Sequence, residues 1–151
     1  MNARNTLIAL TLCTLPLTVF AHQTRNFAFG APGKAADVNR TIHVKATDQM
    51  RFLFDSQTIR RGDVVRFVIT NTGVIPHEFG IGDAAFQHEH AQEMMKMPGM
   101  MHDDPNVVSL KPGETRTLIW SFKKVRNPAL EFACNVPGHY AAGMVTRLTL
   151  K

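Results

Sequence analysis

The chain of 151 residues has little of several features that mark other classes of protein. It has two cysteines, one tryptophan and one tyrosine, and only 19% of its residues are charged. After residue 21, no apolar run approaches the roughly 20 residues that cross a bilayer as a helix. We therefore expect no membrane span, and the length favours one domain over a multidomain enzyme.

The net charge is +5, but the basic residues are not arranged as in proteins that bind nucleic acid. Lysines and arginines are scattered along the chain, without a dense basic block or interleaved aromatic residues. Signatures of Ser-His-Asp hydrolases and of phosphate-binding loops are also absent from the sequence. We expect a mildly basic solvated surface, no nucleic-acid partner and no enzymatic activity.

Residues 1–21 have the pattern of a cleavable signal peptide. Arg4 precedes an apolar stretch over residues 7–20, and Ala21 offers a small residue for cleavage. A lipoprotein anchored through Cys13 is the alternative, but Leu12 stands where such a signal has a small residue. The sequence predicts export to the periplasm, with a mature chain that begins at His22.

The mature chain is predicted to consist of an arm and one β domain. Residues 22–40 are polar and lack periodicity, so we expect a flexible N-terminal arm. From residue 41 onward, short stretches alternate apolar and polar residues between turn sequences, which favours two packed antiparallel sheets over residues 41–151. The predicted strands cover residues 41–46, 51–54, 65–70, 77–81, 118–122, 129–134 and 144–150.

One segment departs from the strand pattern. Residues 84–97 contain no β-branched residue, are rich in helix formers and end at Pro98-Gly99. The predicted fold is therefore an all-β sandwich with one short inserted helix.

A single cysteine, Cys134, remains after signal cleavage. It is a buried thiol, an intermolecular linker or a metal thiolate, and its neighbours distinguish these options. His139 follows after four residues and Met144 after four more, with glycines that let the loop fold over one centre. A second imidazole has to come from elsewhere, and His77 stands at the start of a predicted strand. Two histidines, one cysteine and a weak axial methionine are the ligands of a blue-copper site.

The pattern His77…Cys134-x4-His139-x4-Met144 resembles the cupredoxin (plastocyanin/azurin) family over about residues 41–151. Further segments are similar to the small periplasmic copper-tolerance cupredoxins of Gram-negative bacteria. They are His77-Glu78-Phe79, the run over residues 99–105, Leu110-Lys-Pro-Gly and Cys-x-x-Pro-Gly-His-Tyr-x-Ala-Gly-Met.

The resemblance implies a cupredoxin-like Greek-key β-sandwich with one type 1 copper ion. His77, Cys134 and His139 would be the equatorial ligands and Met144 the axial ligand. The sequence departs from azurin-like members at Glu78, where they have an asparagine that helps to tie the two ligand loops together. The sequence therefore does not assign the residues around the ligands that tune the reduction potential of this site.

A second candidate site is the Met/His cluster in and after the predicted helix. Thioethers and imidazoles suit Cu(I), so the cluster is an expected auxiliary copper site, although methionines on one helical face also serve as core padding. Its members are His88, His90, Met94, Met97, Met100, Met101 and His102, with Met95 between them. His22 would offer a further Cu(II) chelate if cleavage follows Ala21.

Four protein ligands leave no open position for a substrate, so the site favours copper holding or one-electron transfer over catalysis. The preferred function is copper tolerance, with copper ions and a copper-trafficking or redox protein as partners. The alternative is a one-electron carrier between respiratory partners. A third hypothesis is a copper-dependent oxidase or reductase, which would need an additional open copper site.

Overall fold

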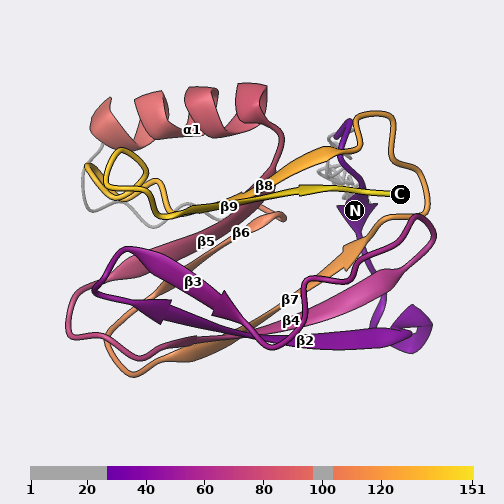
Figure 1. The fold of residues 1–151 in the computed structure, drawn as a ribbon, viewed down its shortest axis with the longest axis horizontal. Coiled ribbons are helices and arrows are strands. Elements are labelled where there is room, and N and C mark those ends of the chain that lie inside the picture. The colour runs from indigo at the N-terminus through magenta and orange to yellow at the C-terminus, as the bar shows by residue number, and fades with distance from the viewer. Residues whose placement is uncertain (1–26, 97–103) are drawn as a thin grey trace, which may run out of the picture.

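The computed structural model describes residues 27–96 and 104–151. Two sheets pack face to face, and one helix covers the outer face of one of them (Figure 1). The elements in chain order are β1 (Ala31–Pro32), the short 3-10 helix η1 (Ala35–Asp37), β2 (Arg40–Thr47), β3 (Arg51–Phe54), β4 (Val64–Asn71), β5 (His77–Gly82), α1 (Ala84–Lys96), β6 (Val107–Leu110), β7 (Thr115–Ser121), β8 (Ala129–Ala133) and β9 (Val145–Thr149).

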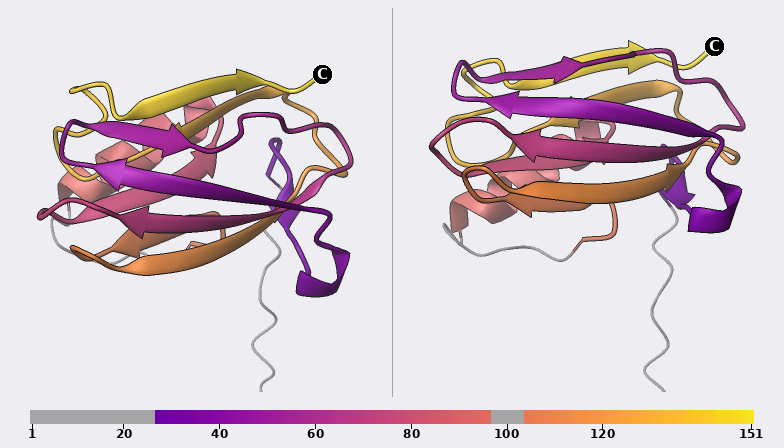
Figure 2. Two further views of the ribbon diagram at one scale, coloured as in Figure 1. Left: turned by 60° about the horizontal axis from the view of Figure 1, so that its bottom comes forward. Right: turned by 90° about the horizontal axis from the view of Figure 1, so that it is seen from below.

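The first sheet has the strand order β1-β7-β4-β2-β3, and the second has the order β6-β5-β8-β9. Figure 2 shows β3, β2, β4 and β7 side by side, with the helix behind them. The predicted all-β sandwich with one inserted helix is confirmed. Strand β6, which the sequence pattern did not predict, pairs with β5 at the edge of the second sheet.

The prediction of purely antiparallel sheets is wrong at one pair. Strands β2 and β4 are parallel, with Ile42 opposite Phe67, whereas the other pairs described are antiparallel. The reason is the connection: β3 forms a hairpin with β2, and residues 55–63 then return the chain to the end where β2 began. Both β2 and β4 consequently run toward the same end of the sandwich, where β5 starts.

The core is aromatic along its length. Phe67 from the first sheet meets Phe79 and Phe132 from the second, with ring centroids 5.6 and 5.5 Å apart, and Phe79 and Phe132 stack at 5.7 Å. All three side chains are buried. Such packing fixes the ends of β5 and β8 relative to each other.

Residues 27–40 do not form the expected arm in the structure. Phe27 and Phe29 are buried and pack on Trp120, whose indole N–H donates to the Phe29 carbonyl at 3.1 Å. Ala31 then pairs with Ser121 in the sheet. Two phenylalanines separated by one residue bury their rings against the end of the sandwich, which outweighs the loss of chain entropy. The predicted signal peptide lies outside the described residues.

Helix α1 agrees with the predicted helix from residue 84 through residue 96, and residue 97 lies outside the described part. Its buried face consists of Gln87, His90 and Met94. Gln87 donates to the carbonyls of Gly80 and Glu131, so the helix is held to β5 and β8 by hydrogen bonds. None of the described helices is long and apolar enough to span a membrane.

Candidate metal centre

His77 is held at the start of β5 by the loop that precedes it. Asn71, at the end of β4, donates to the carbonyls of Ile75 and Leu110 and accepts from the N–H of Gly73. Asp48 accepts from the N–H of Val74, and this bond holds the pKa of Asp48 below its usual value. The charged carboxylate lies 3.3 Å from Nε2 of His77.

This contact decides which nitrogen of His77 faces the centre. With Nε2 donating to Asp48, Nδ1 carries the lone pair. Nδ1 is buried and has no hydrogen-bond partner in the described part of the chain. A buried acceptor without a partner is costly, and a metal ion would satisfy it.

The loop after β8 carries the other three predicted ligands. The N–H of Cys134 donates to the Met144 carbonyl, and the N–H of Met144 donates to the His139 carbonyl. Gly138 and Gly143 have φ values of +89° and +94°, a backbone region that L side chains rarely adopt. The loop therefore folds back on itself, and Met144 is fully buried beside the cysteine strand.

The structure brings His77, Cys134 and His139 together. One ligand atom from each lies within 4.8 Å of the others. Sγ of Cys134 is 3.3 Å from Nδ1 of His139, and the two imidazole rings are 5.1 Å apart between centroids. His77 precedes Cys134 by 57 positions and His139 by 62 positions in the sequence, yet the three side chains converge on one point. Met144 lies at the base of the loop that carries Cys134 and His139.

The electrostatics of the centre fit a soft cation. Burial raises the pKa of the Cys134 thiol to about 12, although the backbone N–H groups of Glu78 and Val136 oppose this. Burial and the neighbouring His77 lower the pKa of His139, so that imidazole is neutral and able to coordinate. The donor set of two imidazoles, one thiol that ionises on metal binding and one thioether fits a type 1 copper ion.

Glu78 occupies the position where azurin-like proteins have asparagine. Its backbone and its side chain make contacts with different parts of the molecule. Its N–H donates to Cys134 Sγ at 3.3 Å, so the backbone ties the two ligand segments together. Its side chain turns to α1, where Oε1 lies 3.0 Å from Nε2 of His90. Asn135, which follows Cys134, donates to the side chain of Gln87 at 2.7 Å, and this bond joins the second ligand segment to α1.

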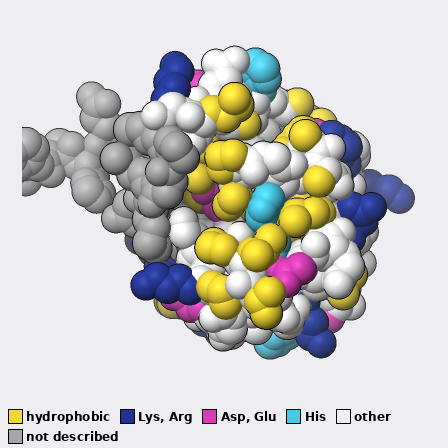
Figure 3. Space-filling view, turned by 90° about the vertical axis from the view of Figure 1, so that its left-hand side faces the viewer, with side chains coloured by type: hydrophobic (Ala, Val, Ile, Leu, Met, Phe, Trp, Pro, Cys, Tyr) yellow, Lys and Arg dark blue, Asp and Glu magenta, His cyan; other side chains and the backbone are white. Residues whose placement is uncertain are grey.

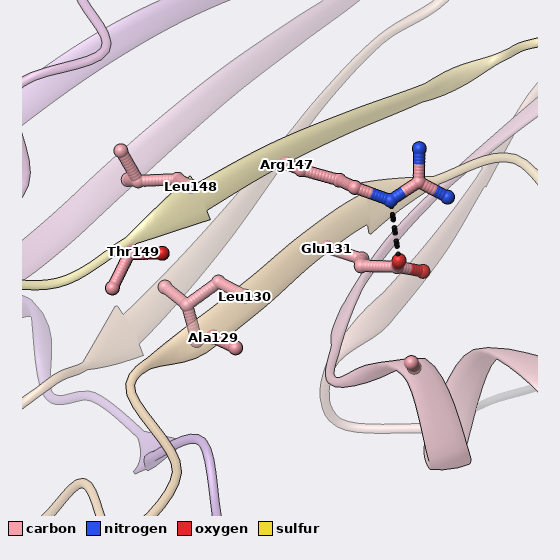
Figure 4. Close-up of a pocket in the computed structure, with 7 residues that line it drawn as sticks. Ala129, Leu130, Glu131, Arg147, Leu148 and Thr149 are labelled. Carbon is pink, nitrogen blue, oxygen red and sulfur yellow. Dashed lines mark hydrogen bonds and ion pairs between the residues drawn. The ribbon is translucent and has the colours of Figure 1, made fainter.

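A polar network anchors the ligand loop from its outer side. Tyr140 donates to Glu131 at 2.8 Å, and Arg147 donates to the other oxygen of the same carboxylate at 2.8 Å. Glu131 and Arg147 also line a shallow pocket of about 220 Å³ on β8 and β9 (Figure 4). None of the four predicted copper ligands lines this pocket.

The end of the molecule that carries the centre is largely apolar at its surface. Figure 3 shows hydrophobic side chains around a histidine on this face. His139, Val136 and Tyr140 are half-buried, and the side chain of Val74 is 82% exposed. The imidazole of His139 is therefore the ligand of the centre that approaches solvent.

Several residues that shape the centre could not be found from the sequence pattern. Asp48, Asn71, Gln87 and Asn135 are polar residues whose partners lie far away in the chain. The Asn71-Thr72-Gly73 sequence marks a turn, but the buried role of the asparagine side chain has no local signal.

The structure describes part of the auxiliary Met/His cluster. His88 is exposed and lies 3.0 Å from Gln92, Met95 is exposed, and His90 and Met94 are buried under the helix. Met97, Met100, Met101 and His102 lie outside the described residues. Copper binding by the cluster therefore stays a prediction.

Comparison with known proteins gives one matching family model and several similar proteins. Residues 38–151 match the family model described as copper binding proteins, plastocyanin/azurin family. The chain is 45% identical over 123 residues to the copper-resistant cuproprotein CopI of Rubrivivax gelatinosus, covering 82% of this chain and 73% of that protein. It is 43% identical over 122 residues to the CopI protein of Vibrio cholerae, covering 80% and 71%.

Solved structures with a similar fold include an auracyanin and an azurin. Reduced auracyanin from Roseiflexus castenholzii matches with a TM-score of 0.61 and 20% identity, covering 76% of this chain and 98% of that chain. An azurin from Methylomonas sp. strain J matches with a TM-score of 0.54 and 18% identity, covering 76% and 99%. At these identities the likeness concerns the fold.

Proposed function

Because the chain belongs to the plastocyanin/azurin family of copper-binding proteins, we propose that it binds one type 1 copper ion to provide copper tolerance in the periplasm. The observation that carries the proposal is the convergence of His77, Cys134 and His139 within 4.8 Å. The two relatives that are 45% and 43% identical in sequence bear the name copper-resistant cuproprotein, which supports tolerance as the role.

The protein would hold the copper ion in a nearly closed site, because three of the four predicted ligands are buried. Copper supplies one-electron redox chemistry when it is bound in such a site. Asp48 fixes the orientation of His77, while the N–H groups of Glu78 and Val136 face the sulfur of Cys134. With Met144 buried behind these groups, the site leaves no position for a substrate, so we propose binding and not catalysis.

Export supports the same role. Residues 1–21 carry the signal-peptide pattern, and their removal leaves Cys134 as the single cysteine. In an oxidising compartment this thiol has no partner for an internal disulfide, and its burial protects it until copper binds. A periplasmic copper binder would also use the Met/His cluster to collect Cu(I).

One-electron transfer is the second candidate function. The apolar surface around the half-buried His139 favours it, because such a surface lets a partner protein approach a ligand of the centre closely. An electron carrier, however, needs a single copper ion and no collecting cluster.

The decisive experiment combines metal analysis with growth. Copper-loaded wild-type protein should show an intense visible thiolate-to-copper band and a spin-resonance spectrum of one type 1 site, and Cys134→Ala should lose both. A strain that lacks the gene should regain copper tolerance with the wild-type gene and not with the Cys134→Ala gene. Equal tolerance with both genes would refute the proposed role of the centre.

The two candidate functions are separated by the methionines of the cluster. Replacing five of them with leucine should reduce Cu(I) uptake to one equivalent and weaken tolerance, while Met50→Leu, outside the cluster, should change neither. Uptake and tolerance unchanged by the five substitutions would favour the electron carrier. The five residues are Met94, Met95, Met97, Met100 and Met101.

A further inference from the structure

A second group of metal-ligating side chains lies between helix α1 and the turn before β6. His90 Nδ1 faces two carboxylates, Glu93 Oε2 at 3.8 Å and Asp104 Oδ2 at 3.9 Å. One ligand atom from each of the three residues lies within 4.8 Å of the others. His90 and Glu93 share a face of the helix, being three residues apart, and Asp104 comes from the turn that enters β6.

These separations are too long for hydrogen bonds and close to those around a metal ion. Ligand atoms at the usual bond lengths of a tetrahedral zinc ion are about 3.4 Å from one another. Bringing the two distances at His90 Nδ1 to that value would take a shift of about half an ångström for each carboxylate oxygen. Glu93 is 40% exposed and Asp104 is 22% exposed, so neither carboxylate is fully enclosed by the core.

The other nitrogen of His90 is held as in metal-binding histidines. Its Nε2 lies 3.0 Å from Oε1 of Glu78, and both side chains are 1% exposed. A carboxylate that accepts from one imidazole nitrogen fixes the tautomer and directs the lone pair of the other nitrogen outward. Here that lone pair is directed at Glu93 and Asp104.

The charge of the group calls for a cation. Glu78 is buried, its Oε2 has no hydrogen-bond partner, and no lysine or arginine within residues 27–96 and 104–151 pairs with it. Burial alone would lower the pKa of His90, but the bond to Glu78 and the charges of Glu78, Asp104 and Glu93 raise it. Three carboxylates around one imidazole thus favour positive charge at this point.

We propose that His90, Glu93 and Asp104 bind a divalent transition-metal ion of the Zn(II) type, with Glu78 as the positioning residue behind His90. The ligands are one imidazole and two carboxylates, which suit borderline divalent ions and not Cu(I). The site shares His90 with the Met/His cluster, but its two carboxylates distinguish it in chemistry from the type 1 centre and from the thioethers of that cluster. It does not depend on the proposed copper function.

The test is a Zn(II) titration by calorimetry of the full mature protein with its type 1 site filled with copper. Wild-type protein should bind one Zn(II) that the Glu93→Gln/Asp104→Asn variant binds at least tenfold more weakly. The matched control is Glu89→Gln, which removes an exposed carboxylate from the same helix and should retain wild-type affinity. Zinc bound at other histidines stays in all three proteins and cancels in the comparison.

The visible copper band and far-ultraviolet circular dichroism, measured on the same samples, report whether each variant is folded and keeps its type 1 centre. If the double variant does not fold, the single variant Glu93→Gln gives the answer, because its side chain is partly exposed. Equal Zn(II) affinity in the wild type and in the folded variant would overturn the proposal. A proton on His90 would then balance the surrounding carboxylates without a metal ion.

Discussion

Replacement of Asn71 by alanine tests whether the first ligand loop is held by a buried side chain. The asparagine is fully buried at the end of β4 and makes three hydrogen bonds to main-chain groups. It donates to the carbonyls of Ile75 and Leu110 at 2.7 and 3.3 Å and accepts from the N–H of Gly73 at 2.9 Å. All three groups lose this partner in Asn71→Ala.

The expected loss in the free energy of unfolding is about 3 kcal/mol, since each of the three bonds contributes roughly 1 kcal/mol. The loop that carries His77 would also lose its anchor, so copper should be bound more weakly and the visible band should shift. Asn39→Ala is the matched control, because this exposed asparagine accepts one bond, from Val64, at the opposite end of β4. It should cost about 1 kcal/mol or less and leave the band unchanged.

The measurements are urea unfolding of the metal-free proteins and visible spectra of the copper-loaded proteins. A loss for Asn71→Ala no larger than that for Asn39→Ala would show that the loop is held by other groups. A large loss of stability with an unaltered copper spectrum would show that Asn71 stabilises the fold but does not position His77.

Three further predictions concern the ligands and their support. Burial raises the pKa of Cys134 to about 12, so the metal-free thiol should react with iodoacetamide far more slowly than free cysteine at pH 8, and copper uptake should release a proton; alkylation at the rate of free cysteine would contradict the burial. Met144→Leu should retain copper and raise the reduction potential measured by voltammetry, because a weak donor to Cu(II) is lost; an unchanged potential would argue against coordination by Met144. A Cβ atom at Gly73 would collide with the carboxylate of Asp48, so Gly73→Ala should weaken copper binding in a competition titration; wild-type affinity would mean that Asp48 does not orient His77.

The convergence of His77, Cys134 and His139 could be predicted because most of the information for it is local. Cys134, His139 and Met144 lie on one loop, and glycines at residues 138 and 143 give that loop its reversed backbone. His77 could be added because the family pattern places it at the start of a strand. Alternation of apolar residues likewise predicted most strands of the two sheets, since each strand buries one face.

The features that the sequence did not reveal depend on partners distant in the chain. The parallel pairing of β2 with β4 follows from the path of residues 55–63, which has no signature of its own. Phe27 and Phe29 stand among glycines and a proline, so their burial becomes visible only beside Trp120. The side chain of Glu78 could not be assigned because His90 lies twelve residues away on a separate element.

The contacts of α1 have a consequence for protein engineering. Polar contacts that join the helix to the sandwich include Glu78 with His90, Gln87 with two strand carbonyls, and Asn135 with Gln87. Transplanting residues 84–96 alone into another sandwich of this type would leave His90 and Gln87 buried without these partners. A successful graft would have to carry Glu78 and Asn135 along, and each of them adjoins a predicted copper ligand in the chain.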